Sequence, residues 1–235
     1  MTTDDRRDPD SLPLFDAADE QRLRADVLRS ITELNIQCLE LFAAQALEQE
    51  TPTCLLLSHV AKLIRTQAWP QALHRAATCP YLLVDVGYAD VQRCQVERVE
   101  NPRPFFTVER TGAVTTQVLS YAWHVCQTAA AARVLMGISE PASRLIAGYT
   151  LPQIHELAAH HAQWIRPRWL NSFRFWRDLL CAAVSGEHIA FERARLHGLH
   201  LLAAESVHST NRKQTRTTDT HIYTNAPDSG LVAAV

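Results

Sequence analysis

The sequence predicts a mainly α-helical protein built from two related units, and three observations support this prediction. Only 7 of the 235 residues are glycine, whereas alanine and leucine are abundant, and such a composition favours helix over sheet. Apolar residues recur at spacings of three and four, which is the pattern of helices with one buried face. A segment around Pro70 returns 82 residues later around Pro152, so we expect the order of elements to repeat.

Composition divides the chain into two tails and a folded part. Residues 1–20 contain seven acidic residues and predict a disordered acidic tail. Residues 206–235 are rich in Ser, Thr and Asn and predict a flexible C-terminal tail. A stiff turn at Asn101–Pro104 is the best internal boundary. The expected units are therefore 21–100 and 101–205, with extra C-terminal helices in the second.

The first unit is expected to hold three helices and a short strand. The first helix starts near Asp19 and ends at Thr51-Pro52, because a residue before proline disfavours the helical conformation. Two further helices are predicted over 54–66 and 69–79. The apolar, partly β-branched run Tyr81–Val86 then predicts a short buried strand.

The second unit repeats this order, starting with a helix over Val114–Val134. Ser139 can cap a short helix that stops near Gly148. Thr150 caps the next helix, and Gln153 completes a capping box, in which two side chains satisfy free backbone groups at the helix start. The place of the first strand then falls on residues 164–169, and two more helices are expected over 172–184 and 187–205.

The repeat is clearest between residues 61–77 and 143–159. Six of these 17 aligned positions are identical, and Lys62 and Arg144 form a like pair. Two similar helix starts could also arise independently. Because the flanking elements follow the same order, we favour an internal duplication.

The second unit also carries the motifs of a known family. It contains Leu135-Met136-Gly137-Ile138-Ser139, then Thr150-Leu151-Pro152-Gln153, with Leu157-Ala158 one turn later and a basic residue at Arg168. This pattern resembles the FlhD family, one subunit of the flagellar master transcription activator. The first long helix is similar to the family's N-terminal helix at Leu28, Ile31, Asn35, Leu39, Leu41, Ala44, Gln45 and Leu47. The resemblance spans roughly residues 25–86 and 115–169.

The resemblance implies a function and a partner. FlhD-like subunits act with a C subunit that carries a four-cysteine zinc site, on flagellar or conjugative-transfer genes. We therefore expect a cytoplasmic activator subunit that binds promoter DNA in a hetero-complex with an FlhC-like zinc-containing partner. A family member usually has one unit, so two units in one chain imply a covalent pseudo-dimer, and further self-association stays open.

The six cysteines of this chain lack the close pairing of a zinc ribbon or finger. By analogy, the zinc would belong to the partner. We expect no cofactor, no metal site and no enzymatic activity in this chain. It also shows no secretory signal and no apolar run of about 18 residues, so we expect no membrane association.

The overall charge excludes strong autonomous DNA binding, because the formal net charge is −2 and autonomous binders usually show a basic excess. A local patch is the better candidate, since residues 157–177 contain no acidic residue. Guanidinium groups suit phosphate oxygens, so the expected DNA contacts are Arg166, Arg168, Arg174 and Arg177. The interleaved aromatic residues expected to face the partner are Trp164, Trp169, Phe173 and Trp176. The alternative is that these aromatic residues are core and the arginines form a solvated face.

Two other functions stay open. One is a helical interaction or assembly protein without DNA contact. The other is a metal-dependent hydrolase that uses His155, Glu156 and His160, but a zinc peptidase motif needs two histidines four residues apart on one helix face. Here the second histidine comes five or six residues after the first, so a solvated helix face is the expected reading.

Overall fold

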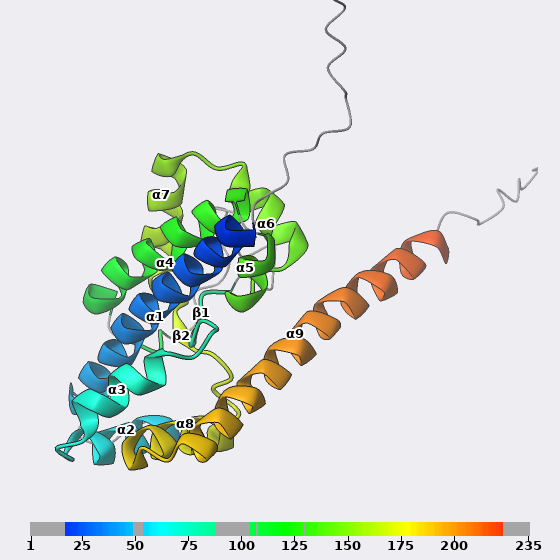
Figure 1. Ribbon diagram of the computed structural model, residues 1–235. Coiled ribbons are helices and arrows are strands. Elements are labelled where there is room, and N and C mark those ends of the chain that lie inside the picture. Colours follow the sequence, from blue (N-terminus) through cyan, green and yellow to red (C-terminus); the bar gives the residue numbers. More distant parts are fainter. Residues whose placement is uncertain (1–16, 49–53, 88–103, 107, 129, 223–235) are drawn as a thin grey trace, which may run out of the picture.

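A computed structural model describes residues 17–48, 54–87, 104–106, 108–128 and 130–222. Over these residues the chain forms nine helices and one two-stranded sheet (Figure 1). The prediction of a mainly α-helical fold is therefore confirmed.

The first unit follows the expected order, with α1 (Ala17–Glu48), α2 (Leu55–Ile64), α3 (Trp69–Ala77) and β1 (Val84–Asp85). The strand is much shorter than the expected run from Tyr81 to Val86. The residues before it use their backbone groups differently: Leu82 N–H donates to Leu135 O at 3.0 Å, and Leu83 N–H donates to the side chain of Asn35 at 2.8 Å. Because these groups bond to helices, they are not available for a sheet.

The second unit contains α4 (Val108–Thr128), α5 (Ala130–Leu135), α6 (Glu140–Ala147), α7 (Leu151–His161) and β2 (Arg166–Pro167). The single helix expected over 114–134 was wrong, because α4 starts earlier and α5 is a separate short helix. Both predicted caps are confirmed. The Ser139 hydroxyl accepts from Ala142 N–H, and Gln153 Oε1 accepts from Thr150 N–H at 2.8 Å.

Two helices follow the second strand, α8 (Phe173–Ser185) and α9 (His188–Ile222). Gly186, with φ 75°, ends α8 in the left-handed conformation that glycine adopts without strain. Residues 206–222, which the sequence assigns to a flexible tail, are part of α9. No glycine or proline follows Gly198 before Pro227, so no helix-breaking residue stops α9 earlier. The acidic tail expected over 1–20 lies outside the described residues except at 17–20, which begin α1.

The two strands connect the two units. They pair antiparallel, with Val84 opposite Pro167 and Asp85 opposite Arg166. The strands are 82 residues apart, which is also the separation of Pro70 and Pro152, and the starts of α3 and α7 have the same separation. Equivalent positions that pair in this crossed way are the arrangement expected of two units facing each other across a local two-fold axis.

One buried amide side chain organises the first unit. Asn35 lies in α1 and has no exposed surface. Its Nδ2 donates to the carbonyl oxygens of Ala77, Cys79 and Tyr81 at 3.2, 3.3 and 2.9 Å, while its Oδ1 accepts from Leu83 N–H. The segment between α3 and β1 is therefore attached to α1 by one side chain that replaces missing backbone partners.

An aromatic cluster joins α1 to the C-terminal helices. Phe42 of α1 stacks on Phe106 and meets Trp176 of α8 edge-on, both at 5.3 Å between ring centroids. Phe175 and Trp176 are fully buried. This contact buries the N-terminal half of α8 against the body (Figure 1), so α8 is part of the common core.

We predict that Asn35→Leu lowers the free energy of unfolding by about 3 kcal/mol or more, because it leaves three buried carbonyl groups and one N–H without this partner. Urea unfolding monitored by circular dichroism measures this loss. Thr32→Ala is the matched control on the same helix, since the Thr32 hydroxyl bonds only to its own helix at Leu28 O. Equal stability of Asn35→Leu and the wild type would contradict the assigned role.

Alkaline pH is expected to destabilise the protein through Cys79. Burial raises the pKa of this thiol to about 12, whereas an unfolded thiol titrates near 8.5. Because the pKa is raised in the folded state, the contribution is fully present below about pH 8.5 and is lost as the pH rises toward 12. The urea midpoint should fall over this range, and Cys79→Ala should fall less steeply. The exposed Cys181→Ala is the control, and an identical pH dependence of both variants would rule out Cys79 as a cause.

Candidate nucleic-acid interface

Arg166, the first of the predicted DNA contacts, is half-exposed on β2. Its Nε and Nη2 atoms lie 3.1 and 2.9 Å from Asp85 Oδ2, directly across the sheet. The other oxygen of Asp85 accepts from Gly87 N–H at 2.7 Å. The charge of Arg166 is therefore balanced by a residue of the first unit, 81 positions away.

Arg168 is buried, and its predicted DNA contact was wrong. Its side chain is only 3% exposed. Nε and Nη2 donate to Glu205 Oε2 at 3.1 and 2.5 Å, and Nη1 lies 3.3 Å from Leu135 O and 3.4 Å from Leu82 O. The guanidinium also lies 4.9 Å from the ring centroid of Trp169. All its donor atoms are used inside the protein, so none can reach a phosphate.

The buried guanidinium explains the glycine of the Leu-Met-Gly-Ile segment. Gly137 has φ +76°, and a Cβ placed there would lie 2.2 Å from Arg168 Nη2. Only glycine leaves space for the guanidinium while adopting this backbone conformation. Two family-like positions, Gly137 and Arg168, therefore belong to one structural contact.

Arg174 and Arg177 lie on the exposed surface of α8, with side chains 81% and 51% exposed. Both lie near Asp178, Arg174 at 3.7 Å and Arg177 at 2.8 Å. Exposed ion pairs of this kind are weak, and two arginines share one carboxylate. These two residues are therefore still accessible to an anion.

The predicted partner-facing aromatic residues are only partly accessible. Trp176 is fully buried in the core, so its predicted role at a partner surface was wrong. The other three are partly exposed and already pack within the chain: Trp164 against His161, Trp169 against Tyr81 and Phe175, and Phe173 against His59. Their exposed edges are the part left for a partner.

The histidines of α7 do not converge. His155 and His160 are exposed, whereas His161 is buried with Nδ1 3.3 Å from Val86 O. Within the described residues, no three His, Cys, Asp or Glu side chains are grouped as metal ligands would be. The metal-dependent alternative therefore has no donor set in that part of the chain.

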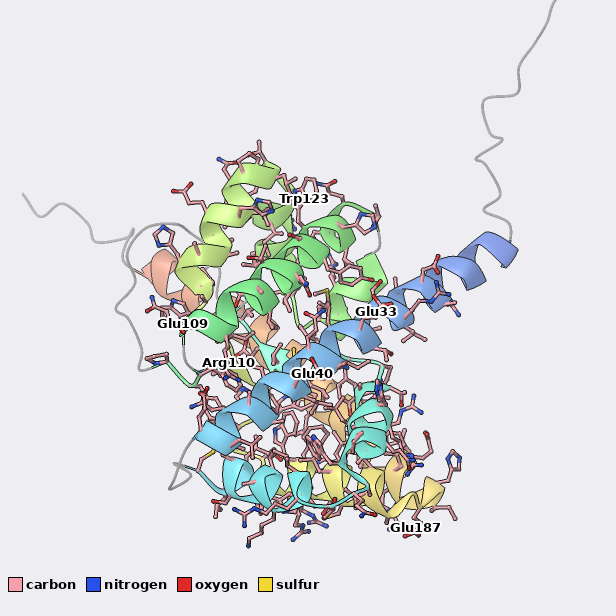
Figure 2. The ribbon with its side chains drawn as sticks, turned by 90° about the vertical axis from the view of Figure 1, so that its left-hand side faces the viewer. Glu33, Glu40, Glu109, Arg110, Trp123 and Glu187 are labelled. Carbon is pink, nitrogen blue, oxygen red and sulfur yellow. The ribbon has the colours of Figure 1, made fainter. Side chains whose placement is uncertain are left out.

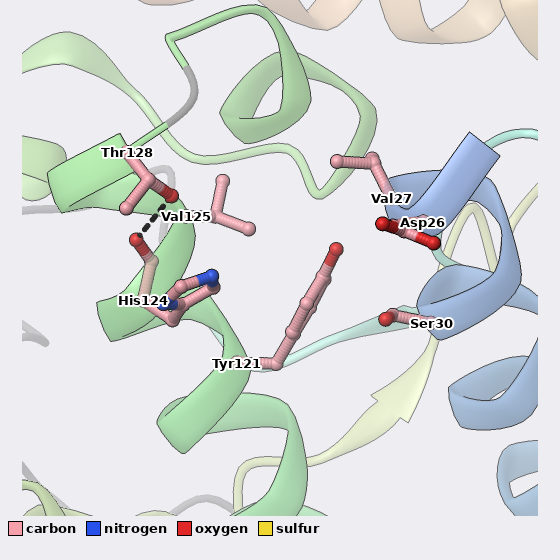
Figure 3. A pocket seen from close by; sticks show the side chains of 7 residues that line it. All are labelled: Asp26, Val27, Ser30, Tyr121, His124, Val125 and Thr128. Atoms are coloured by element: carbon pink, nitrogen blue, oxygen red, sulfur yellow. Dashed lines mark hydrogen bonds between the residues drawn. The ribbon is translucent and has the colours of Figure 1, made fainter. Parts of the chain in front are cut away.

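Two features that the sequence did not indicate appear between helices. A cavity of about 80 Å³ lies between α1 and α4, where the Tyr121 hydroxyl faces Asp26 and Ser30 (Figure 3). Burial raises the pKa of Tyr121, although a hydrogen bond with Ser30 lowers it. The cavity is far below the roughly 300 Å³ of small ligand sites. The second feature is a contact of 3.6 Å between Cys181 Sγ and His59 Nε2. Both pairs join residues about 90 or more positions apart, so no local pattern could reveal them.

No protein-family model, no curated protein and no solved structure matches this chain. The described helices include none that is long and apolar enough to cross a membrane. The assignment of function therefore rests on the residues and their geometry.

The two neighbouring arginines of β2 and its flank should differ sharply on substitution. Arg168→Ala should lower the free energy of unfolding by about 3–5 kcal/mol, because it leaves Glu205 and two carbonyl groups unpaired around a buried space. Arg166→Ala should cost less than about 1 kcal/mol, since its ion pair is half-exposed. Chemical denaturation of both variants measures the difference, and similar losses would disprove the assigned burial of Arg168.

Proposed function

We propose that the chain is an FlhD-like subunit of a transcription activator, in which two FlhD-like units form a covalent pseudo-dimer. The observation that carries this proposal is the pairing of β1 with β2. In a symmetric homodimer, if residue i contacts residue j of the partner, then j contacts i. Val84–Pro167 and Asp85–Arg166 are the same relation within one chain, since the two strands occupy equivalent positions of the 82-residue repeat.

The positions that carry the family resemblance support the proposal by their structural roles. Gln153 caps α7 at Thr150, Gly137 accommodates Arg168, and Asn35 attaches the segment before β1. Each is a contact that depends on the specific side chain and not on general polarity. A shared fold is a direct reason for a chain to keep such residues.

The distribution of charge supports a partner for DNA binding. Arg166, Arg174 and Arg177 all have acidic neighbours, and Arg168 is buried. The face formed by α1 and the start of α4 presents Glu33, Glu40 and Glu109, with Arg110 paired to Glu48 (Figure 2). The compact part of the chain thus lacks a strongly basic face over its described residues. An FlhC-like zinc-containing partner would supply the remaining positive charge.

The paired arginines also favour a second candidate, a helical assembly protein that never contacts DNA. Under this candidate, Arg174 and Arg177 are a solvated surface of α8, and the exposed edges of Trp164 and Phe173 serve another protein. The two candidates agree on a protein partner and differ only in whether the complex binds DNA.

The experiment is co-expression of the chain with a neighbouring gene product that carries two Cys-x-x-Cys pairs. We expect a stable hetero-complex with zinc in the partner, and promoter binding that weakens steeply with salt. Arg174→Ala with Arg177→Ala should reduce the promoter affinity of the complex by about 10-fold, because it removes two phosphate contacts. Arg29→Ala with Arg144→Ala removes the same charge from other exposed helix positions and is the control.

Each result separates the candidates. A hetero-complex that binds no DNA would leave the assembly protein as the function. Failure to form any complex with such a partner would overturn the proposal of an FlhD-like subunit.

A further inference from the structure

The inner half of α9 is firmly attached to the body of the protein. Phe191 and Leu202 are buried, and the Tyr81 hydroxyl donates to Arg195 O at 3.2 Å. At Gly198, an added Cβ would lie 1.9 Å from this hydroxyl oxygen, so the helix packs here as closely as a backbone can. The last contact of this kind is the ion pair between Glu205 and Arg168.

The outer half of α9 has no such attachment. Beyond Glu205 the helix continues to Ile222, away from the other helices (Figure 1), over about 25 Å at 1.5 Å per residue. Between residues 206 and 221 the only large apolar residue is Val207. A helix without an apolar stripe cannot bury a face against its own domain, so a partner outside the chain is the remaining source of contacts.

The charge of this outer half differs from that of the whole chain. Residues 206–218 include Arg212, Lys213 and Arg216 and no acidic residue, although the chain has a net charge of −2. The other polar residues of this stretch are Ser, Thr, Asn, Gln and one His. These are the residue types that contact phosphate and sugar groups in protein–DNA complexes.

We propose that residues 206–218, the outer half of α9, form an arm that docks on the phosphate backbone of duplex DNA. A single α-helix matches the major groove, which is about 12 Å wide. A membrane surface is a poorer match, because helices at that interface need an apolar face, and this stretch has only Val207. The latch between Arg168 and Glu205 fixes the direction in which the arm leaves the body.

The arm adds a DNA contact to the proposed function but can be tested without it. Backbone binding is independent of sequence, so neither the promoter nor the protein partner is needed. Loss of the hetero-complex would overturn the proposed function, whereas the arm stands or falls on the binding of random-sequence DNA by the chain alone.

The test compares full-length wild type with Arg212→Ala, Lys213→Ala and Arg216→Ala combined, using fluorescence anisotropy of a random-sequence duplex of about 20 base pairs at low salt. The wild type should bind with a salt slope near −2.7 if three phosphates are contacted, and the variant should lose about 10-fold or more in affinity and most of this slope. Alanine favours helix, and the unfolding temperature should be unchanged because the arm makes no contact with the core.

The control variant combines Arg29→Ala, Lys62→Ala and Arg144→Ala, which removes the same charge from exposed positions on three other helices. It should keep the wild-type affinity within about two-fold. An equal loss in the control would mean that net charge alone governs binding and would overturn the arm. Undiminished binding by the arm variant, no duplex binding by the wild type, or binding only to vesicles of phosphatidylserine and phosphatidylcholine would each overturn it as well.

Discussion

The arrangement of the second unit depends on one buried charge, the guanidinium of Arg168. A charge at 3% exposure costs several kcal/mol unless it is fully paired. Here the pairing comes from three separate places: the carboxylate of Glu205 on α9, the carbonyl of Leu135 at the end of α5, and the carbonyl of Leu82 before β1. None of these elements can move without leaving the guanidinium unpaired, and Gly137 must lack a Cβ so that it fits.

This contact also makes the two units unequal. The position equivalent to Arg168 in the 82-residue repeat is Val86, which is apolar and buried. Valine can fill a core but cannot hold a carboxylate, so only the second unit can fix a helix through an ion pair. Two separate copies of one unit would carry identical contacts on both sides. A single chain with two diverged units can carry one α9 and direct it from one side only.

The same contact changes how the basic segment is understood. Arginines that are close in sequence meet acidic partners from distant elements: Asp85 on β1, Asp178 on α8 and Glu205 on α9. The compact body is therefore close to electrostatic balance where the sequence suggested a positive face. Positive charge without nearby acidic residues occurs instead at the end of the chain, on the outer half of α9.

The sequence by itself determined the helical fold class, the approximate helix positions and the caps at Ser139 and Thr150, because these depend on neighbours within a few residues. It also placed a strand after each Pro-Gln helix. Only the tertiary structure decided that Arg168 is buried and that Trp176 belongs to the core, since their partners lie far away in the sequence. It also decided the length of β1, because the carbonyl and N–H groups before Val84 bond to Asn35 and Arg168. Local pattern cannot show which distant group will satisfy a backbone or a charge, and that choice separates a structural arginine from a binding one.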